Sequence, residues 1–305
     1  MITQVILAIL KTFLAFGVGA FARWRGYLKP ESLGSLSRFT IDILMSMMVF
    51  EAVSSGLRGQ PWELVLVPPA IGFFMTLAGF LAGYPCALLL RDKSAERKSS
   101  FLHLCAVNNF LFLPLIIVSE IWGEEHIALL LLISIGFTVG QWTIGIMPFG
   151  GMKDWRTVLK KLCNPNLVAA LLGITVAVNN IPVPELIGQT VSMLGDITVP
   201  LMLVIIGAAL PDGCRKIAGS GADLALYTLC RLIVIPLILI GILKLLPLDT
   251  AIYETAMIVA MMPGSSAAVL IVRNYGGDHD FAGGAIVIST IVSLATIPAM
   301  LYVLL

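Results

Sequence analysis

Charged residues are scarce in this sequence. Lys, Arg, Asp and Glu together make up 12% of its 305 residues, whereas 58% are apolar and the mean hydropathy is +0.98. A soluble domain carries about a quarter charged residues, and roughly 20 apolar residues suffice to cross about 30 Å of hydrocarbon. The composition therefore excludes a soluble domain and predicts an all-α, polytopic protein of the lipid bilayer. It also provides no basic, aromatic-rich surface for nucleic acid.

Cysteines and catalytic motifs are equally sparse. The five cysteines are scattered, without a CxxC pair or the spacing of a zinc site. There is no HExxH, no Gly-x-Gly-Asp and no nucleotide-binding P-loop. We therefore expect no metal, no cofactor, no intramembrane enzyme and no transport powered directly by ATP.

The N-terminal apolar stretch lacks the basic leader of a signal peptide. Residues 1–22 end in Ala20-Phe21-Ala22, which resembles a cleavage site, but the first basic residue is Lys11, in mid-stretch. A signal peptide needs positive charge before its apolar core, and here Arg23 and Arg25 follow the core instead. We predict a retained first helix.

The hydrophobic segments predict ten membrane-spanning helices. They lie at residues 3–22, 33–57, 64–90, 99–119, 124–148, 164–180, 186–210, 222–246, 250–272 and 282–304. The loops after the odd-numbered spans, with their flanks, hold 15 of the 19 Lys and Arg residues. These include Lys153, Arg156, Lys160 and Lys161 after the fifth span and Arg215 and Lys216 after the seventh. Because basic loops stay in the cytoplasm, both termini are predicted to lie on the extracytoplasmic side of the cell membrane.

The spans divide into two sets of five, residues 1–150 and 151–305, which together form one membrane domain. An odd number per half makes the second half cross the membrane in the opposite sense, and a shift of 154 residues places Asp42 over Asp196. The fourth span of each half contains a proline, Pro114 or Pro263. Proline removes a backbone donor and clashes with the preceding turn. Simple kinks are the alternative.

Polar residues beside both prolines favour real breaks. Asn108 and Asn109 precede Pro114, and Gly264 and Ser265 follow Pro263. Backbone freed by a break in lipid must face protein or a water-filled cavity. We predict broken helices at 105–116 and 258–268 that cross beside a polar hollow. Inverted repeats with a broken helix in each half are typical of secondary transporters.

Several short motifs resemble the auxin efflux carrier family. They are the run 198–203 (Thr-Val-Pro-Leu-Met-Leu) with 206–210 (Ile-Gly-Ala-Ala-Leu), Asn164-Pro165-Asn166, Arg231-Leu232 with Pro236, Met262-Pro263, Tyr275-Gly276, Ser289-Thr290, Ser293 and Thr296-Ile297-Pro298. The likeness covers nearly the whole chain and is clearest after residue 160. It implies ten helices, with spans one, two, six and seven as a scaffold against which the other six move.

The resemblance also implies a substrate site. In the plant members an asparagine of the fourth helix and one of the Asn-Pro-Asn motif hold the substrate carboxylate. The matching positions are Asn108 or Asn109, and Asn164 or Asn166. The sequence departs from the family at Ser46, where proline is usual, and at position 116, since the proline stands at 114 instead.

Three ionisable residues lie deep in predicted spans, where a charge costs at least ~2.5 kcal/mol and is a functional candidate. Asp42 could bind a proton or an ion, or pair with Arg38 or Arg231. Asp196 could do the same, or form a hydrogen-bonded break. Arg231 could pair with a carboxylate cargo, or it could snorkel to the cytoplasmic surface or hold an acidic partner.

These features predict a secondary active carrier, and not an enzyme, for a small organic anion such as a mono- or dicarboxylate, with alternating access around a midplane site. The predicted site residues are Asn108, Asn109, Pro114, Asn164, Asn166, Pro263, Gly264 and Ser265. The alternative is a cation–proton antiporter that uses Asp42 and Asp196. The sequence leaves open the acid, the direction of transport, coupling to protons or sodium, and whether the protein is a homodimer.

Overall fold

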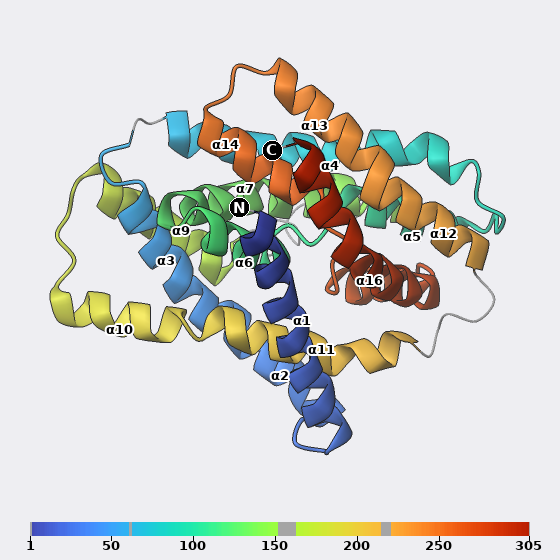
Figure 1. Cartoon of the computed structure of the whole chain (residues 1–305), viewed down its shortest axis with the longest axis horizontal. Coiled ribbons are helices and arrows are strands. Elements are labelled where there is room, and N and C mark those ends of the chain that lie inside the picture. Colours follow the sequence, from blue (N-terminus) through green and yellow to red (C-terminus); the bar gives the residue numbers. More distant parts are fainter. Residues whose placement is uncertain (1, 61–62, 152–162, 215–220, 305) are drawn as a thin grey trace.

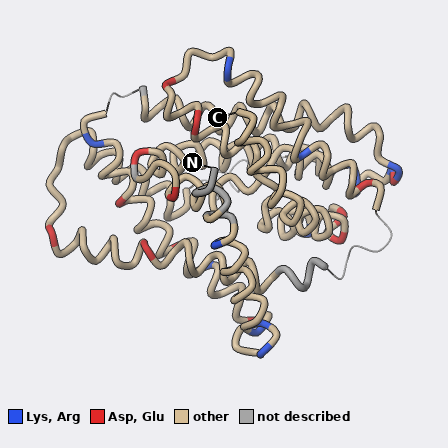
Figure 2. Tube along the Cα trace, in the orientation of Figure 1, with Lys and Arg blue, Asp and Glu red and all other residues tan. Residues whose placement is uncertain are grey.

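The computed structural model describes residues 2–60, 63–151, 163–214 and 221–304, and these residues form helices and no strand. The basic residues predicted at 153, 156, 160, 161, 215 and 216 lie outside this part of the chain. Charged residues lie mainly at the helix ends and in loops (Figure 2), which agrees with a membrane protein.

The first half begins with the long helix α1 and ends in a 3₁₀ turn. Its elements are α1 (Ile2–Trp24), α2 (Pro30–Phe39), the π-helical turn η1 (Thr40–Leu44), α3 (Met45–Gly56), α4 (Glu63–Ala87), α5 (Ala95–Ala106), α6 (Phe112–Ile121), α7 (Glu124–Gly140), the π-helical turn η2 (Gln141–Gly145) and the 3₁₀ turn η3 (Met147–Phe149). The turns η1 and η2 continue their helices without a break, because the residues that flank them keep right-handed helical backbone angles.

The second half has a similar order of long and short helices. It contains α9 (Pro165–Val178), α10 (Glu185–Gly195), α11 (Thr198–Cys214), α12 (Gly221–Leu229), the π-helical turn η4 (Cys230–Val234), α13 (Ile235–Leu245), α14 (Thr250–Ala260), α15 (Ala268–Asn274) and α16 (His279–Leu304). Helices α10 and α11 follow one another almost end to end, separated at Asp196 and Ile197 (Figure 1).

Six helices of the described residues are long and apolar enough to cross a membrane: Pro30–Gly56, Leu64–Ala87, Glu125–Phe149, Glu185–Ala209, Gly221–Leu245 and His279–Leu304. These match six of the ten predicted spans. Phe112–Ile121, Pro165–Val178 and Thr250–Ala260 are apolar but shorter. The chain is therefore a multi-pass membrane protein.

Close helix pairs bring distant parts of the chain together. Helix α1 packs along α11, α3 along α9, and α4 along α7. A Cβ on Gly19 would overlap the backbone of Val204, and a Cβ on Gly207 would overlap that of Phe16. Only glycine permits this close approach of α1 to α11. Such small-residue contacts are expected in a membrane, because helices there associate through close van der Waals packing and not through the hydrophobic effect.

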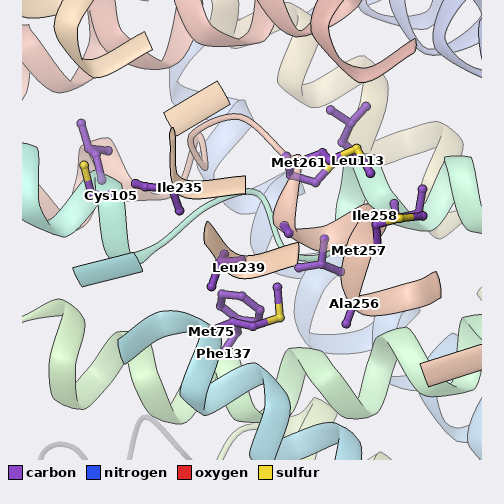
Figure 3. Packing of buried hydrophobic residues seen from close by; sticks show 14 of the residues in the cluster. Met75, Cys105, Leu113, Phe137, Ile235, Leu239, Ala256, Met257, Ile258 and Met261 are labelled. Carbon is purple, nitrogen blue, oxygen red and sulfur yellow. The ribbon is translucent and has the colours of Figure 1, made fainter. Parts of the chain in front are cut away.

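The largest apolar core lies between α4, α7, α13, α14 and α16. Met75 of α4, Phe137 of α7 and Leu239 of α13 meet there beneath the end of α14, where Met257 and Ile258 are fully buried (Figure 3). This core supports the end of α14 and the unwound segment that follows it.

Two helical segments are interrupted in mid-course. Helix α5 ends at Ala106 and α6 begins at Phe112, while α14 ends at Ala260 and α15 begins at Ala268. Pro263 lies inside the second interruption. Pro114, by contrast, is the third residue of α6 and follows the first interruption. The proline therefore stands in the first turn of a helix, where its missing N–H is not needed, and not in the break where it was predicted.

An ion cluster joins helix ends on one side of the molecule. Arg97, in the first turns of α5, donates to Asp223 of α12 at 2.9 Å and to Asp278 before α16 at 2.9 Å. Asp223 also accepts from the backbone N–H groups of Arg91 and Asp92. Because Arg97 and Asp223 are both buried, this network fixes α4, α5, α12 and α16 relative to one another.

Candidate functional site

The two interruptions cross and pair through their backbones. Asn108 and Gly264 form an isolated antiparallel bridge, and the backbone N–H of Asn109 donates to the Pro263 carbonyl at 2.8 Å. Unwound backbone inside a membrane protein must find such partners, since no water or lipid group can replace them. Part of the backbone freed by the breaks is therefore paired across the crossing itself.

The two adjacent asparagines point to different surroundings. Asn108 is 1% exposed, and its side-chain amide donates to the Val259 carbonyl near the end of α14. Asn109 instead lines a cavity. The sequence left open which of the two faces the substrate site, and Asn109 is the one that lines this cavity.

The cavity encloses about 440 Å³ between the crossing, α3, α7 and the start of α9. Of the eight predicted substrate-binding residues, Asn109, Asn164, Asn166 and Ser265 line it. Asn108, Pro114, Pro263 and Gly264 do not, although Asn108, Pro263 and Gly264 form the crossing that carries Asn109 and Ser265. The remaining wall is mainly apolar and includes Met45, Val49, Phe110, Phe112, Leu131 and Ile135.

The Asn-Pro-Asn motif builds one wall of the cavity. Asn164 is the N-cap of α9, and its side-chain oxygen accepts from the backbone N–H of Leu167 at 2.9 Å. Pro165 occupies the first helical position, which its fixed φ suits. The Asn166 side chain lies 2.9 Å from the Ser46 hydroxyl of α3. The motif therefore starts a helix at the cavity and joins it to the neighbouring helix.

The polar lining consists of amides and hydroxyls, with one carboxylate. No Lys, Arg or His is among the described residues that line the cavity. Asp42 of η1 lines it, and its carboxylate is paired with Arg38 at 3.2 Å. The N-termini of α6 and α9 also meet the cavity, since Leu111 and Asn164 are their N-caps. A helix N-terminus carries about half a positive charge.

The other two charged candidates lie elsewhere. Asp196 borders a separate hollow between α3 and α10, together with Glu51 and Arg58. Arg231 is 2% exposed and donates to backbone carbonyls instead of to Asp42 or to the cavity. Of the predicted ionisable residues, only Asp42 therefore lies where a cargo or coupling ion in this cavity would meet it.

One polar contributor was missed from the sequence. Ser134 lines the cavity from α7, with Thr138 one turn further on and Gln141 in η2. The three hydroxyl and amide side chains recur at spacings of four and three residues in an apolar helix, which places them on one face. That spacing was the available signal. Two of the three π-helical turns found among the described residues, η1 and η2, thus present a polar side chain to the cavity, and π-helical turns often lie at functional sites.

Interrupted helices that cross beside a cavity with polar side chains on a mainly apolar wall define the class as a multi-pass membrane transport protein. The chain belongs to the membrane transport protein family, whose pattern matches residues 4–156 and 155–301, and this confirms the resemblance to the auxin efflux carriers. It is 24% identical over 300 residues to an uncharacterized transporter of Methanothermobacter thermautotrophicus, covering 97% of this chain and 96% of the relative. It is 23% identical over 296 residues to an uncharacterized transporter of Methanocaldococcus jannaschii, covering 94% and 95%.

Proposed function

We propose that this protein is a secondary active carrier of a small organic anion, a mono- or dicarboxylate, across the cell membrane. The cargo carboxylate lies in the cavity beside the crossing and accepts hydrogen bonds from Asn109, Asn164 and Asn166. The observation that carries this proposal is that these amides, from two distant parts of the chain, line one cavity that contains no basic side chain among its described residues.

The amides and helix ends suit an anion. Each amide offers two N–H donors, and the N-termini of α6 and α9 add positive potential without a counter-ion of their own. A carboxylate bound there would be held by donors and dipoles, which release it more readily than a buried arginine would. Easy release is what a carrier needs on both sides of the membrane.

We further propose that the chain crosses the membrane ten times as two inverted repeats, residues 1–150 and 151–305, with both termini outside the cell. The ten crossings are α1, α2–η1–α3, α4, α5–α6, α7–η2, α9, α10–α11, α12–η4–α13, α14–α15 and α16. Three observations support this division. The two matched stretches of the family meet at residues 155–156. Helix α1 packs on α11, and α3 packs on α9. Exchanging the two halves converts one pair into the other, because α1 corresponds to α9 and α3 to α11. The break at Asp196 lies where the 154-residue shift places η1.

Transport in proteoliposomes tests the site. A thermal-shift screen of small carboxylates first identifies a cargo, because a ligand that binds the folded state raises Tm by mass action. Asn109→Ala should then abolish uptake of that acid and its thermal shift, while leaving the unliganded Tm within about 2 °C of the wild type. Unchanged uptake by Asn109→Ala would remove the cavity from the transport path.

A cation–proton antiporter is the second candidate, because Asp42 lines the same cavity. Against it, Asp42 is paired with Arg38, and Asp196 borders a different hollow. Sodium-dependent proton movement in proteoliposomes without any organic acid would select this candidate over the first.

A further inference from the structure

Arg231 joins both broken helices through three hydrogen bonds. Its Nε donates to the Met262 carbonyl at 3.0 Å, Nη2 to the Ala260 carbonyl at 2.8 Å, and Nη1 to the Cys105 carbonyl at 3.1 Å. Ala260 is the last residue of α14, Met262 follows it in the interruption, and Cys105 is the penultimate residue of α5. One guanidinium therefore binds the C-terminal ends of two half-helices.

These carbonyls lack the partners of a continuous helix. The last four carbonyls of a helix have no intrahelical donor, and two helix C-termini together carry about one negative charge. The Asn108 side-chain amide donates to the Val259 carbonyl, and the backbone N–H of Asn109 donates to the Pro263 carbonyl. Arg231 supplies donors for three further carbonyls, together with one positive charge that matches the two helix ends.

In the described part of the chain, no acidic side chain is paired with Arg231. The ion pairs recorded among the described residues involve other side chains. A buried charge is costly unless it is paired and hydrogen-bonded, and here the helix ends are its counter-charge. Arg231 is held in place by the buried helix that carries it, in which Tyr227, four residues earlier, is also fully buried and contacts the Leu104 carbonyl at 3.5 Å.

In transporters with broken helices, unwound carbonyls and half-helix C-termini are the groups that coordinate sodium. We propose that Arg231 is a built-in cation at this position: it occupies the carbonyl cluster of the crossing permanently, so no dissociable sodium ion is needed to hold the crossing together. Arg231 does not line the cargo cavity and is thus a positioning residue, which keeps Asn109 and Ser265 in register. This role of Arg231 rests on the proposed carrier function, but the experiments that test it require no cargo.

Chemical rescue tests the proposal. Arg231→Ala leaves the carbonyls without donors, so amide hydrogen exchange in residues 107–111 and 261–267 should rise about tenfold or more. Millimolar methylguanidinium should restore slow exchange and raise the Tm of this variant, since it can enter the vacated site and supply the same donors. Leu232→Ala is the matched control, because Leu232 lies in the same π-helical turn and is 1% exposed. It should lose stability without any response to methylguanidinium.

Two further measurements keep the proposal falsifiable. If Arg231→Ala does not fold, Arg231→Lys retains the charge with fewer donors, and its faster exchange should be confined to the same two segments. Replacing choline by sodium should leave the Tm of the wild type unchanged. Exchange that rises uniformly in all helices, rescue that is equal in both alanine variants, or stabilisation of the wild type by sodium would each overturn the proposal. None of these results bears on uptake by Asn109→Ala, so the two proposals fail separately.

Discussion

Asn108 and Gly264 face each other in an antiparallel backbone bridge, although they lie 156 positions apart in the sequence. This bridge is the point at which the two interrupted helices touch. Behind it, the Ser289 hydroxyl of α16 lies 3.4 Å from the backbone nitrogen of Gly264. The cavity depends on this contact, because Asn109 and Ser265, which line it, directly follow the two bridged residues.

Gly264→Ala should therefore disturb the crossing. A Cβ at this position would lie 2.6 Å from the Tyr227 hydroxyl oxygen and 3.1 Å from Ile286 Cγ1. Overpacking of this kind costs about 1–3 kcal/mol, so we expect a lower Tm and faster exchange of the Asn109 amide. Gly241→Ala is the control, since nothing lies within 4 Å of a Cβ there and alanine favours the helix by about 1 kcal/mol. Equal Tm values for the two variants would contradict a close crossing.

Replacing each of the two adjacent asparagines should affect a different property. Asn108→Ala removes a buried hydrogen bond to the Val259 carbonyl, and we expect a loss of about 1–3 kcal/mol in stability. Asn109→Ala removes a side chain that lines the cavity, and we expect lost cargo binding with stability retained. Urea or thermal unfolding in detergent, beside a binding assay, checks both. The opposite pattern would mean that Asn108 faces the cargo.

Cys163 provides a test of orientation and access. It is exposed and lines the cavity, and it directly follows the basic segment predicted to be cytoplasmic. In a variant with Cys163 as its only cysteine, a membrane-impermeant maleimide should label inverted membrane vesicles and spare right-side-out vesicles. A bound cargo should slow the labelling. Labelling from the outer face would reverse the proposed topology.

The Arg97 cluster should contribute strongly to stability through its buried member. Asp223→Asn leaves the buried Arg97 with a weaker partner, and breaking a buried ion pair costs about 3–5 kcal/mol. Asp92→Asn is the matched control, because Asp92 is the exposed partner of the same arginine, at 3.5 Å. We expect at most a small effect there. A similar Tm for both variants would show that the cluster is solvated.

The same cluster predicts a direction of pH dependence. The backbone N–H of Ser94 and then its hydroxyl lower the pKa of the Asp92 carboxyl, and Arg97 adds to the effect. A carboxyl whose pKa is lower in the folded state stabilises that state above its unfolded pKa and loses this contribution as the pH falls. The Tm of the wild type should therefore fall more than that of Asp92→Asn between neutral pH and about pH 3. Parallel Tm curves would contradict this assignment.

Much of the helical plan could be predicted from the sequence. The six long apolar helices match predicted spans, because hydrophobic length is set by bilayer thickness and needs no knowledge of contacts. Asn164 as an N-cap followed by Pro165 is likewise a local signal. The position of the first break was harder to predict, since Pro114 marked the segment but stands in the helix that follows the break.

The side chains of the site depended on tertiary contacts. Nothing local distinguishes Asn108 from Asn109; they differ only because the bridge to Gly264 turns one toward α14 and the other toward the cavity. The partners of Arg231 could not be predicted from sequence either. They are main-chain carbonyls more than 25 residues away, which carry no signature in the sequence.

The sequence by itself determined that the chain is helical, lies in a membrane and belongs with transport proteins. Hydropathy, proline placement and short motifs are properties of the local sequence and need no knowledge of tertiary contacts. Only the tertiary structure decided which polar groups share the cavity and which hold the crossing. The physical reason is that backbone N–H and C=O groups inside a membrane protein must find partners, and those at a break are partnered through the packing of helices distant in sequence.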